Sequence, residues 1–153
     1  MLKKIFIFLL SFLPWTFSSF IPVHYGYFKE LQLPFFTPPT IFYPIAWTLV
    51  YLFIAFSITI IIDTYGFKKI PLSYKITLLI NYLFNQSFTL VFFGLHNTFL
   101  GFISCLGTFV SCLFLYQETY ELKEKSTKLL DPYVLLSLFA TILSLTIYLM
   151  NTL

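Results

Sequence analysis

The chain carries little charge: Asp, Glu, Lys and Arg make up only 10% of its 153 residues. A soluble domain of ordinary composition carries roughly 25% charged residues. Hydrophobic residues make up 59% of the chain, and arginine is absent altogether. A folded chain of this composition would expose too much apolar surface to be stable in water. The composition therefore excludes a soluble domain and indicates an integral membrane protein.

Uncharged stretches long enough to cross a bilayer occur five times in the sequence. A hydrocarbon core about 30 Å thick needs roughly 20 apolar residues in one helix. Barrel strands are about 10 residues long and alternate apolar with polar residues, and runs such as Ile58–Ile62 do not alternate. We therefore expect an all-α integral membrane protein, a five-transmembrane-helix bundle that forms a single domain over residues 1–153. The expected spans are Ile5–Val23, Ile41–Ile62, Ile76–Leu95, Thr98–Gln117 and Pro132–Leu153.

Lysine placement predicts the orientation of the bundle. With five spans, eight of the nine lysines fall on one side of the membrane, and only Lys29 falls on the other. The positive-inside rule then places the N-terminus in the cytoplasm and the C-terminus outside. We interpret the lysines as topology signals and expect no nucleic-acid partner. Basic residues that are all lysine, with abundant Phe, Ile, Leu and Tyr, suggest an AT-rich genome and a bacterial cytoplasmic membrane. The first span also resembles a signal peptide, but its cleavage site is weak because Ser18-Ser19 precedes the bulky Phe20.

Catalytic motifs are missing from the sequence. It has no Gly-rich phosphate loop, no metal-spaced Cys/His set and no nucleophile motif, so no metal site and no required cofactor are expected. Cys105 and Cys112 lie seven residues apart in one span, about 10 Å along a helix, which is too far for a disulfide. His24 and His96 fall on the outer side and could contact a ligand carboxylate or a porphyrin metal, although lone interfacial histidines more often have no special role.

Polar and stiff segments point to a site inside the bundle. Asn81 and Asn85 are four residues apart and share one helix face, which should point inward, as ligand contacts or as interhelical glue. Trp47 lies within a span and is either bundle packing or pocket wall. The connection over residues 24–40 is aromatic and rich in proline, with Pro38 and Pro39 fixing the backbone. We call it loop one and expect a lid over the bundle mouth; an interfacial anchor is the alternative.

Three segments carry motifs that occur together in one family. The first runs from Pro34-Phe35-Phe36-Thr37-Pro38-Pro39 to Trp47, eight residues after the proline pair, and Tyr51, four further on. The second is Asn85, Phe88 and Phe92-Phe93-Gly94, and the third is Pro132-Tyr133, Phe139-Ala140-Thr141 and Asn151. Together they resemble the translocator protein family, the tryptophan-rich sensory proteins. The chain departs from that family at Phe36, Phe88 and Leu136, which stand where tryptophans are usual.

This resemblance implies a five-helix bundle of a kind that is often a homodimer, with a ligand pocket between helices under loop one. Family ligands include porphyrins, haem-related tetrapyrroles, sterols and benzodiazepine-type drugs. Aromatic walls suit a flat π-system, and a single amide can orient it. The expected ligand-binding residues, carried over by position, are Trp47, Asn85, Phe88, Leu136, Ala140, Tyr51, Pro38, Pro39 and Phe36.

Three functions are compatible with these expectations. The first is a membrane-embedded binding or sensory protein for a hydrophobic ring ligand, with porphyrin or haem as a ligand. The second is an enzyme that degrades porphyrin in light, which the missing tryptophans would weaken. The third is a small transporter, which is disfavoured because the spans carry no ionisable residue to couple an ion and show no repeat pair.

Overall fold

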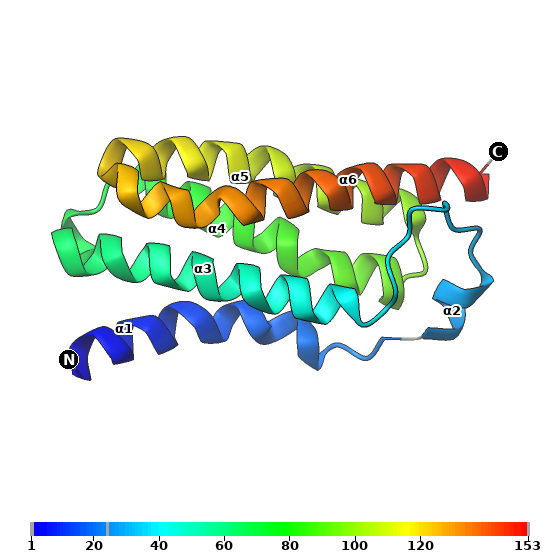
Figure 1. Cartoon of the computed structure of the whole chain (residues 1–153), viewed down its shortest axis with the longest axis horizontal. Coiled ribbons are helices and arrows are strands. Elements are labelled where there is room, and N and C mark those ends of the chain that lie inside the picture. Colours follow the sequence, from blue (N-terminus) through cyan, green and yellow to red (C-terminus); the bar gives the residue numbers. More distant parts are fainter. Residues whose placement is uncertain (1, 24, 153) are drawn as a thin grey trace.

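The computed structural model describes residues 2–23 and 25–152, and almost all of them lie in helices (Figure 1). Four helical runs are long and apolar enough to cross a membrane: Leu2–Phe20, Phe42–Tyr65, Leu72–Gly94 and Thr98–Thr152. The last run, of 55 residues, folds back on itself at the short helix η4 (Lys128–Leu130), so that α5 (Thr98–Thr127) and α6 (Asp131–Thr152) pack side by side. The chain therefore has five membrane-crossing segments, and the expected all-α fold class is confirmed.

Two of the five segments are not regular α-helices. The first begins as α1 (Leu2–Phe12) and continues as the 3₁₀-helix η1 (Leu13–Phe20). Pro14, which has no backbone N–H, stands at the start of η1 and cannot continue an α-helical ladder. The third begins as α4 (Leu72–Phe88) and ends in a π-helical segment, η3 (Thr89–Gly94). Hydropathy alone indicates neither change.

The second segment, α3 (Phe42–Tyr65), packs against α1, η1, α5 and α6, while η1 also contacts α4 directly (Figure 1). Its buried residues contribute to this packing: Tyr51 packs against the ring of Trp15 in η1, with ring centroids 5.6 Å apart. Tyr133 of α6 also meets the Trp15 ring, edge to face at 6.3 Å. The centre of the bundle is thus an aromatic cluster around one tryptophan.

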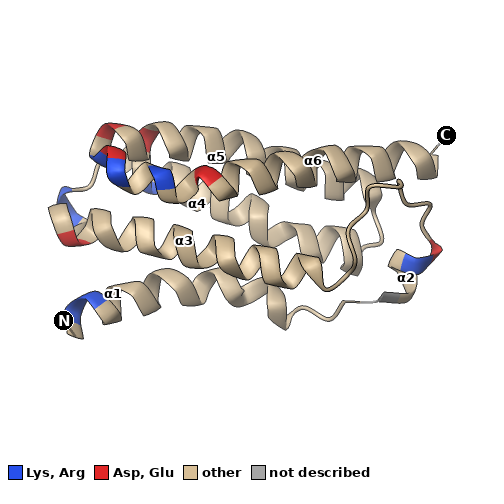
Figure 2. Ribbon diagram, viewed as in Figure 1, with Lys and Arg blue, Asp and Glu red and all other residues tan. Residues whose placement is uncertain are grey.

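Most of the charged residues collect at one end of the bundle, whereas Lys29 and Glu30 lie at the opposite end (Figure 2). At the charged end, Lys4 forms an ion pair with Asp63 at 2.9 Å. The charged segment after Gln117 continues α5 as a helix to Thr127, except that Lys123 is non-helical (φ −162°, ψ 96°). The opposite end carries loop one, with the short helix α2 (Tyr25–Glu30), which the sequence did not predict. His24 lies outside the described residues.

Candidate ligand pocket

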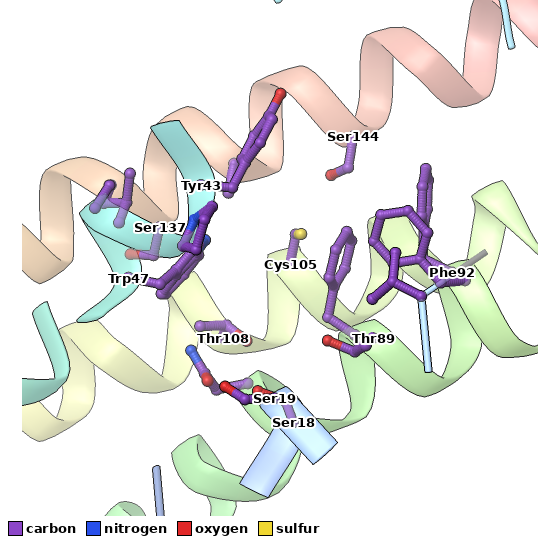
Figure 3. Close-up of a pocket in the computed structure, with 18 of the residues that line it drawn as sticks. Ser18, Ser19, Tyr43, Trp47, Thr89, Phe92, Cys105, Thr108, Ser137 and Ser144 are labelled. Carbon is purple, nitrogen blue, oxygen red and sulfur yellow. The ribbon is translucent and has the colours of Figure 1, made fainter. Parts of the chain in front are cut away.

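A cavity of about 400 Å³ lies in the loop-one half of the bundle, lined mainly by η1, α3, α4, η3, α5 and α6, with Phe28 and Thr40 of loop one (Figure 3). Six of the nine expected ligand-binding residues line it: Trp47, Tyr51, Asn85, Phe88, Leu136 and Ala140. They come from three helices and meet because α3, α4 and α6 face one space. The structure therefore brings most of the expected site together around a single cavity.

Three expected site residues do not line the cavity. Phe36 packs edge to face on Phe139, with centroids 6.4 Å apart, and Phe139 is itself a lining residue. Phe36 therefore supports the wall from behind. Pro39 accepts a hydrogen bond from the backbone N–H of Phe42 at 2.9 Å, at the start of α3. Pro38 and Pro39 thus shape the entry of the chain into α3, away from the cavity surface.

Phenylalanines at the end of α4 and in the π-helical segment η3 form one wall of the cavity. Phe88 and Phe92 stack with centroids 5.1 Å apart and planes 16° apart, and Phe93 stands edge to face against Phe92 at 4.9 Å. Gly101 of α5 makes this arrangement possible, because a Cβ at that position would lie 2.5 Å from a ring carbon of Phe92. π-Helical segments often occur at functional sites, and this one forms an aromatic wall.

The opposite wall comes from α3. Figure 3 shows Trp47 and Tyr43 on one side of the cavity and Phe92 on the other, with the sulfur of Cys105 directed into the space between them. Trp47 rests against Tyr51 and Tyr133, at centroid distances of 5.8 and 6.3 Å. Its indole is held by the aromatic core while one face borders the cavity.

Asn85 lines the cavity, but its polar atoms are largely used between helices. Its Oδ1 accepts from the Tyr51 hydroxyl at 2.8 Å and from Gln86 Nε2 at 2.9 Å, and its Nδ2 donates to the Tyr133 hydroxyl at 3.4 Å. An amide nitrogen has two N–H donors, so one remains beyond these contacts. Asn85 therefore links α4 to α3 and α6, and one of its N–H donors lies outside these contacts.

Asn81, one turn below Asn85, extends the same network. The Tyr133 hydroxyl donates to its Oδ1 at 2.8 Å, and its Nδ2 donates to Thr108 O at 3.0 Å and to Ser111 Oγ at 2.9 Å. We call Tyr51, Asn81, Asn85, Gln86 and Tyr133 the amide–tyrosine network. The expectation that Asn81 and Asn85 share an inward face is confirmed, since both are buried.

Sequence reasoning missed several lining residues. Tyr43 lines the cavity, and its hydroxyl is buried without a hydrogen-bond partner within the described part of the chain. No local pattern marks it. On α6, the lining positions include Leu136, Ala140, Leu143 and Ile147. Their spacing of three and four residues follows one helix face, so this wall could have been extended from Leu136 and Ala140 by periodicity.

Loop one is attached across the end of the cavity. The Asn151 side chain, near the end of α6, accepts from the Gln32 backbone N–H at 2.9 Å and donates to Gln32 O at 3.0 Å. Tyr27 of α2 stacks on His96 with centroids 4.4 Å apart, and its partial burial raises the pKa of the Tyr27 phenol. These contacts attach loop one to the end of α6 and to His96, between η3 and α5. That loop one acts as a lid stays a prediction.

The fold and cavity define a helical membrane protein with an internal apolar site. A model of the TspO/MBR family matches residues 5–149, so the chain belongs to this family. It is 36% identical over 150 residues to the tryptophan-rich protein TspO of Bacillus cereus, covering 97% of each chain. It is 33% identical over 130 residues to YtaB, an uncharacterized membrane protein of Bacillus subtilis, covering 85% of this chain and 83% of that one. It is 30% identical over 128 residues to the TspO of Archaeoglobus fulgidus, covering 82% and 80%.

Proposed function

We propose that this protein binds a hydrophobic ring ligand of the porphyrin type in the cavity between α3 and η3. The observation that carries the proposal is the pair of aromatic walls, Trp47 on one side and the stacked Phe88 and Phe92 on the other, across about 400 Å³ of space. Small-molecule sites commonly measure roughly 300–1,000 Å³ and are mostly apolar with a few polar groups. A flat π-system inserted between such walls would contact aromatic faces on both sides.

Binding can be followed through the protein's own tryptophans. The chain has two, Trp47 at the cavity and Trp15 in the closed aromatic core. Titrating purified protein in lipid nanodiscs with protoporphyrin should quench the Trp47 fluorescence in a saturable way. Trp15→Phe, which leaves Trp47, should keep the signal. A control would contain empty nanodiscs and free tryptophan. If the protein's fluorescence fell linearly with protoporphyrin, without saturating and by the same amount as in this control, the proposal would be refuted.

One observation favours a second function, light-driven degradation of the bound porphyrin. Trp47, an oxidisable indole, borders the cavity directly. We expect little of this activity, because Phe88 and Leu136 occupy positions where the family usually has tryptophan, and neither side chain is readily oxidised. The complex should therefore lose porphyrin absorbance under illumination no faster than Trp47→Phe. Clearly faster loss than in Trp47→Phe and in free porphyrin would favour the enzyme.

We also propose that the charged end faces the cytoplasm and loop one faces outward. The supporting observation is the collection of lysines at one end of the bundle (Figure 2), which the positive-inside rule assigns to the cytoplasm. Both native cysteines would be replaced by Ala and a single Cys placed at Lys29 or at Lys125. An impermeant thiol reagent applied to intact cells should label position 29. Preferential labelling at position 125 would reverse the orientation.

A further inference from the structure

We propose that the cavity opens sideways to the bilayer, between η1 and α3, and that the ligand enters by this opening and not past loop one. The inference rests on the proposed function and adds the route to it. The first observation is where the lining residues are exposed. The exposed lining residues are Ser19, Thr40, Phe42, Pro44 and Thr48. Ser19 belongs to η1, and Phe42, Pro44 and Thr48 belong to the first turns of α3. Thr40 is the last residue of loop one, just before α3, whereas the lining residues of α4, α5 and α6 are buried or half-buried.

The path of the first span explains why a gap lies there. At the charged end, α1 packs closely on α3, with the rings of Phe8 and Phe56 4.6 Å apart. Beyond Trp15, η1 is instead attached to α4. Gln86 accepts from the Ser18 backbone N–H at 2.8 Å and donates to Trp15 O at 3.2 Å. The first span therefore leaves α3 just where the cavity begins.

Gln86 is a positioning residue: it holds η1 against α4 and so keeps the opening between η1 and α3. Its side chain is buried, and both of its polar ends are used on the η1 backbone or on Asn85. A further hydrogen bond from α4, in which the Tyr82 hydroxyl donates to Pro14 O at 3.1 Å, also holds η1 against α4. On the side toward α3, the exposed lining residues include two with short side chains, Ser19 and Thr48.

The opening lies at membrane depth. Ser19 falls within the expected span Ile5–Val23, and Thr48 within Ile41–Ile62. The other end of the cavity is crossed by loop one, which the paired hydrogen bonds between Asn151 and Gln32 attach to α6. An apolar ring ligand partitions into hydrocarbon, so it would meet the lateral opening first.

Stopped-flow quenching of Trp47 by vesicles carrying protoporphyrin tests the route. Ser19→Phe and Thr48→Phe should narrow the opening without filling the aromatic site. We expect association and dissociation to slow together by about tenfold, with the Kd held within about threefold, as for a barrier on the path. Leu49→Phe is the matched control, because Leu49 is exposed on α3 but does not line the cavity, and its rates should not change. Asn151→Ala, which releases loop one, should also leave both rates unchanged.

The alternatives give different results. Wild-type protein that shows no saturable quenching at all would refute the proposed function itself. Saturable binding with unchanged rates in both Phe variants would refute the lateral route alone. Faster association and dissociation in Asn151→Ala would place the route at loop one. Loss of equilibrium binding in Thr48→Phe would mean that Thr48 contacts the bound ligand and does not lie at the entrance, which would also contradict the proposed route. Slowing confined to Ser19→Phe and Thr48→Phe supports the opening.

Discussion

The two halves of the bundle are built differently. In the charged half, α1 and α3 are regular helices in close contact. Ser57 of α3 and Ser126 of α5 are linked by two hydrogen bonds: the Ser57 hydroxyl donates to Ser126 O at 3.1 Å, and the Ser126 hydroxyl donates to Ser57 O at 3.0 Å. In the loop-one half, the first span is a 3₁₀-helix, the third ends in a π-helix, and the space between them is a cavity. The irregular helices and the empty space occur together, which indicates that departures from α-geometry create the site.

The amide–tyrosine network lies at the boundary between the halves. Helices in a bilayer gain no hydrophobic driving force from contacting one another, so packing and interhelical hydrogen bonds hold them together. Asn81, Asn85 and Gln86 link α4 to α3, α5, α6 and η1. This network can keep the cavity from collapsing while leaving the loop-one half loosely packed. The comparison predicts that changes in the two halves affect different properties.

The largest effect is expected in the loop-one half, from Ala140→Leu. Ala140 lines the cavity, and a bulkier side chain there would occupy the ligand's space. Overpacking of this kind costs roughly 1–3 kcal/mol, or about 5- to 150-fold in affinity for protoporphyrin. Quenching titration gives the Kd, and thermal unfolding should show little change. Ile142→Leu, on the exposed side of the same helix, is the control, and equal losses in both variants would contradict a cavity at Ala140.

At the boundary, Asn81→Ala should lower stability more than affinity. The substitution removes three buried hydrogen bonds. At roughly 0.6–1 kcal/mol each, these amount to about 2 kcal/mol of the free energy of unfolding. Thermal unfolding in detergent would measure the change, compared with Thr146→Ala on the exposed face of α6. Unfolding at the wild-type temperature would show that the network does not hold the helices together.

In the charged half, Ser57→Ala should have a smaller effect, confined to stability. Ser57 is buried, and its Oγ bonds to Ser126 across the α3–α5 contact, so its loss should cost about 1 kcal/mol. The Kd for protoporphyrin should stay at the wild-type value, because neither serine lines the cavity. A weakened Kd without loss of stability would mean that the two halves are coupled and not separate.

Much of the fold could be predicted because bilayer insertion imposes simple length and charge rules. Uncharged runs of about 20 residues identify membrane segments whatever their neighbours, and the short connection around His96 requires α4 and α5 to be adjacent. The 3₁₀ and π segments could not be predicted in this way. They depend on tertiary contacts, such as the Gln86 bonds to η1 and the fit of Phe92 against Gly101, which no local pattern contains.

The site was predictable where motif positions and helix periodicity agree, and less so elsewhere. Trp47, Phe88 and Ala140 line the cavity as expected, because fixed spacing on a helix fixes the face. Asn85 also lines it, but its role as interhelical glue became evident only from its partners on α3 and α6. Phe36 shows the opposite case: it belongs to the motif, yet packs behind Phe139.

The two native cysteines provide the most direct test of the difference between the halves. Cys105 lines the cavity, whereas Cys112, two turns along the same helix, is fully buried and does not line it. Single-cysteine variants, Cys112→Ala and Cys105→Ala, would be treated with a small membrane-permeant maleimide in nanodiscs, with and without protoporphyrin. Cys105 should react and be protected by protoporphyrin, while Cys112 should react only after unfolding. Equal reactivity at the two positions, or labelling of Cys105 that protoporphyrin leaves unchanged, would contradict a ligand cavity in the loop-one half.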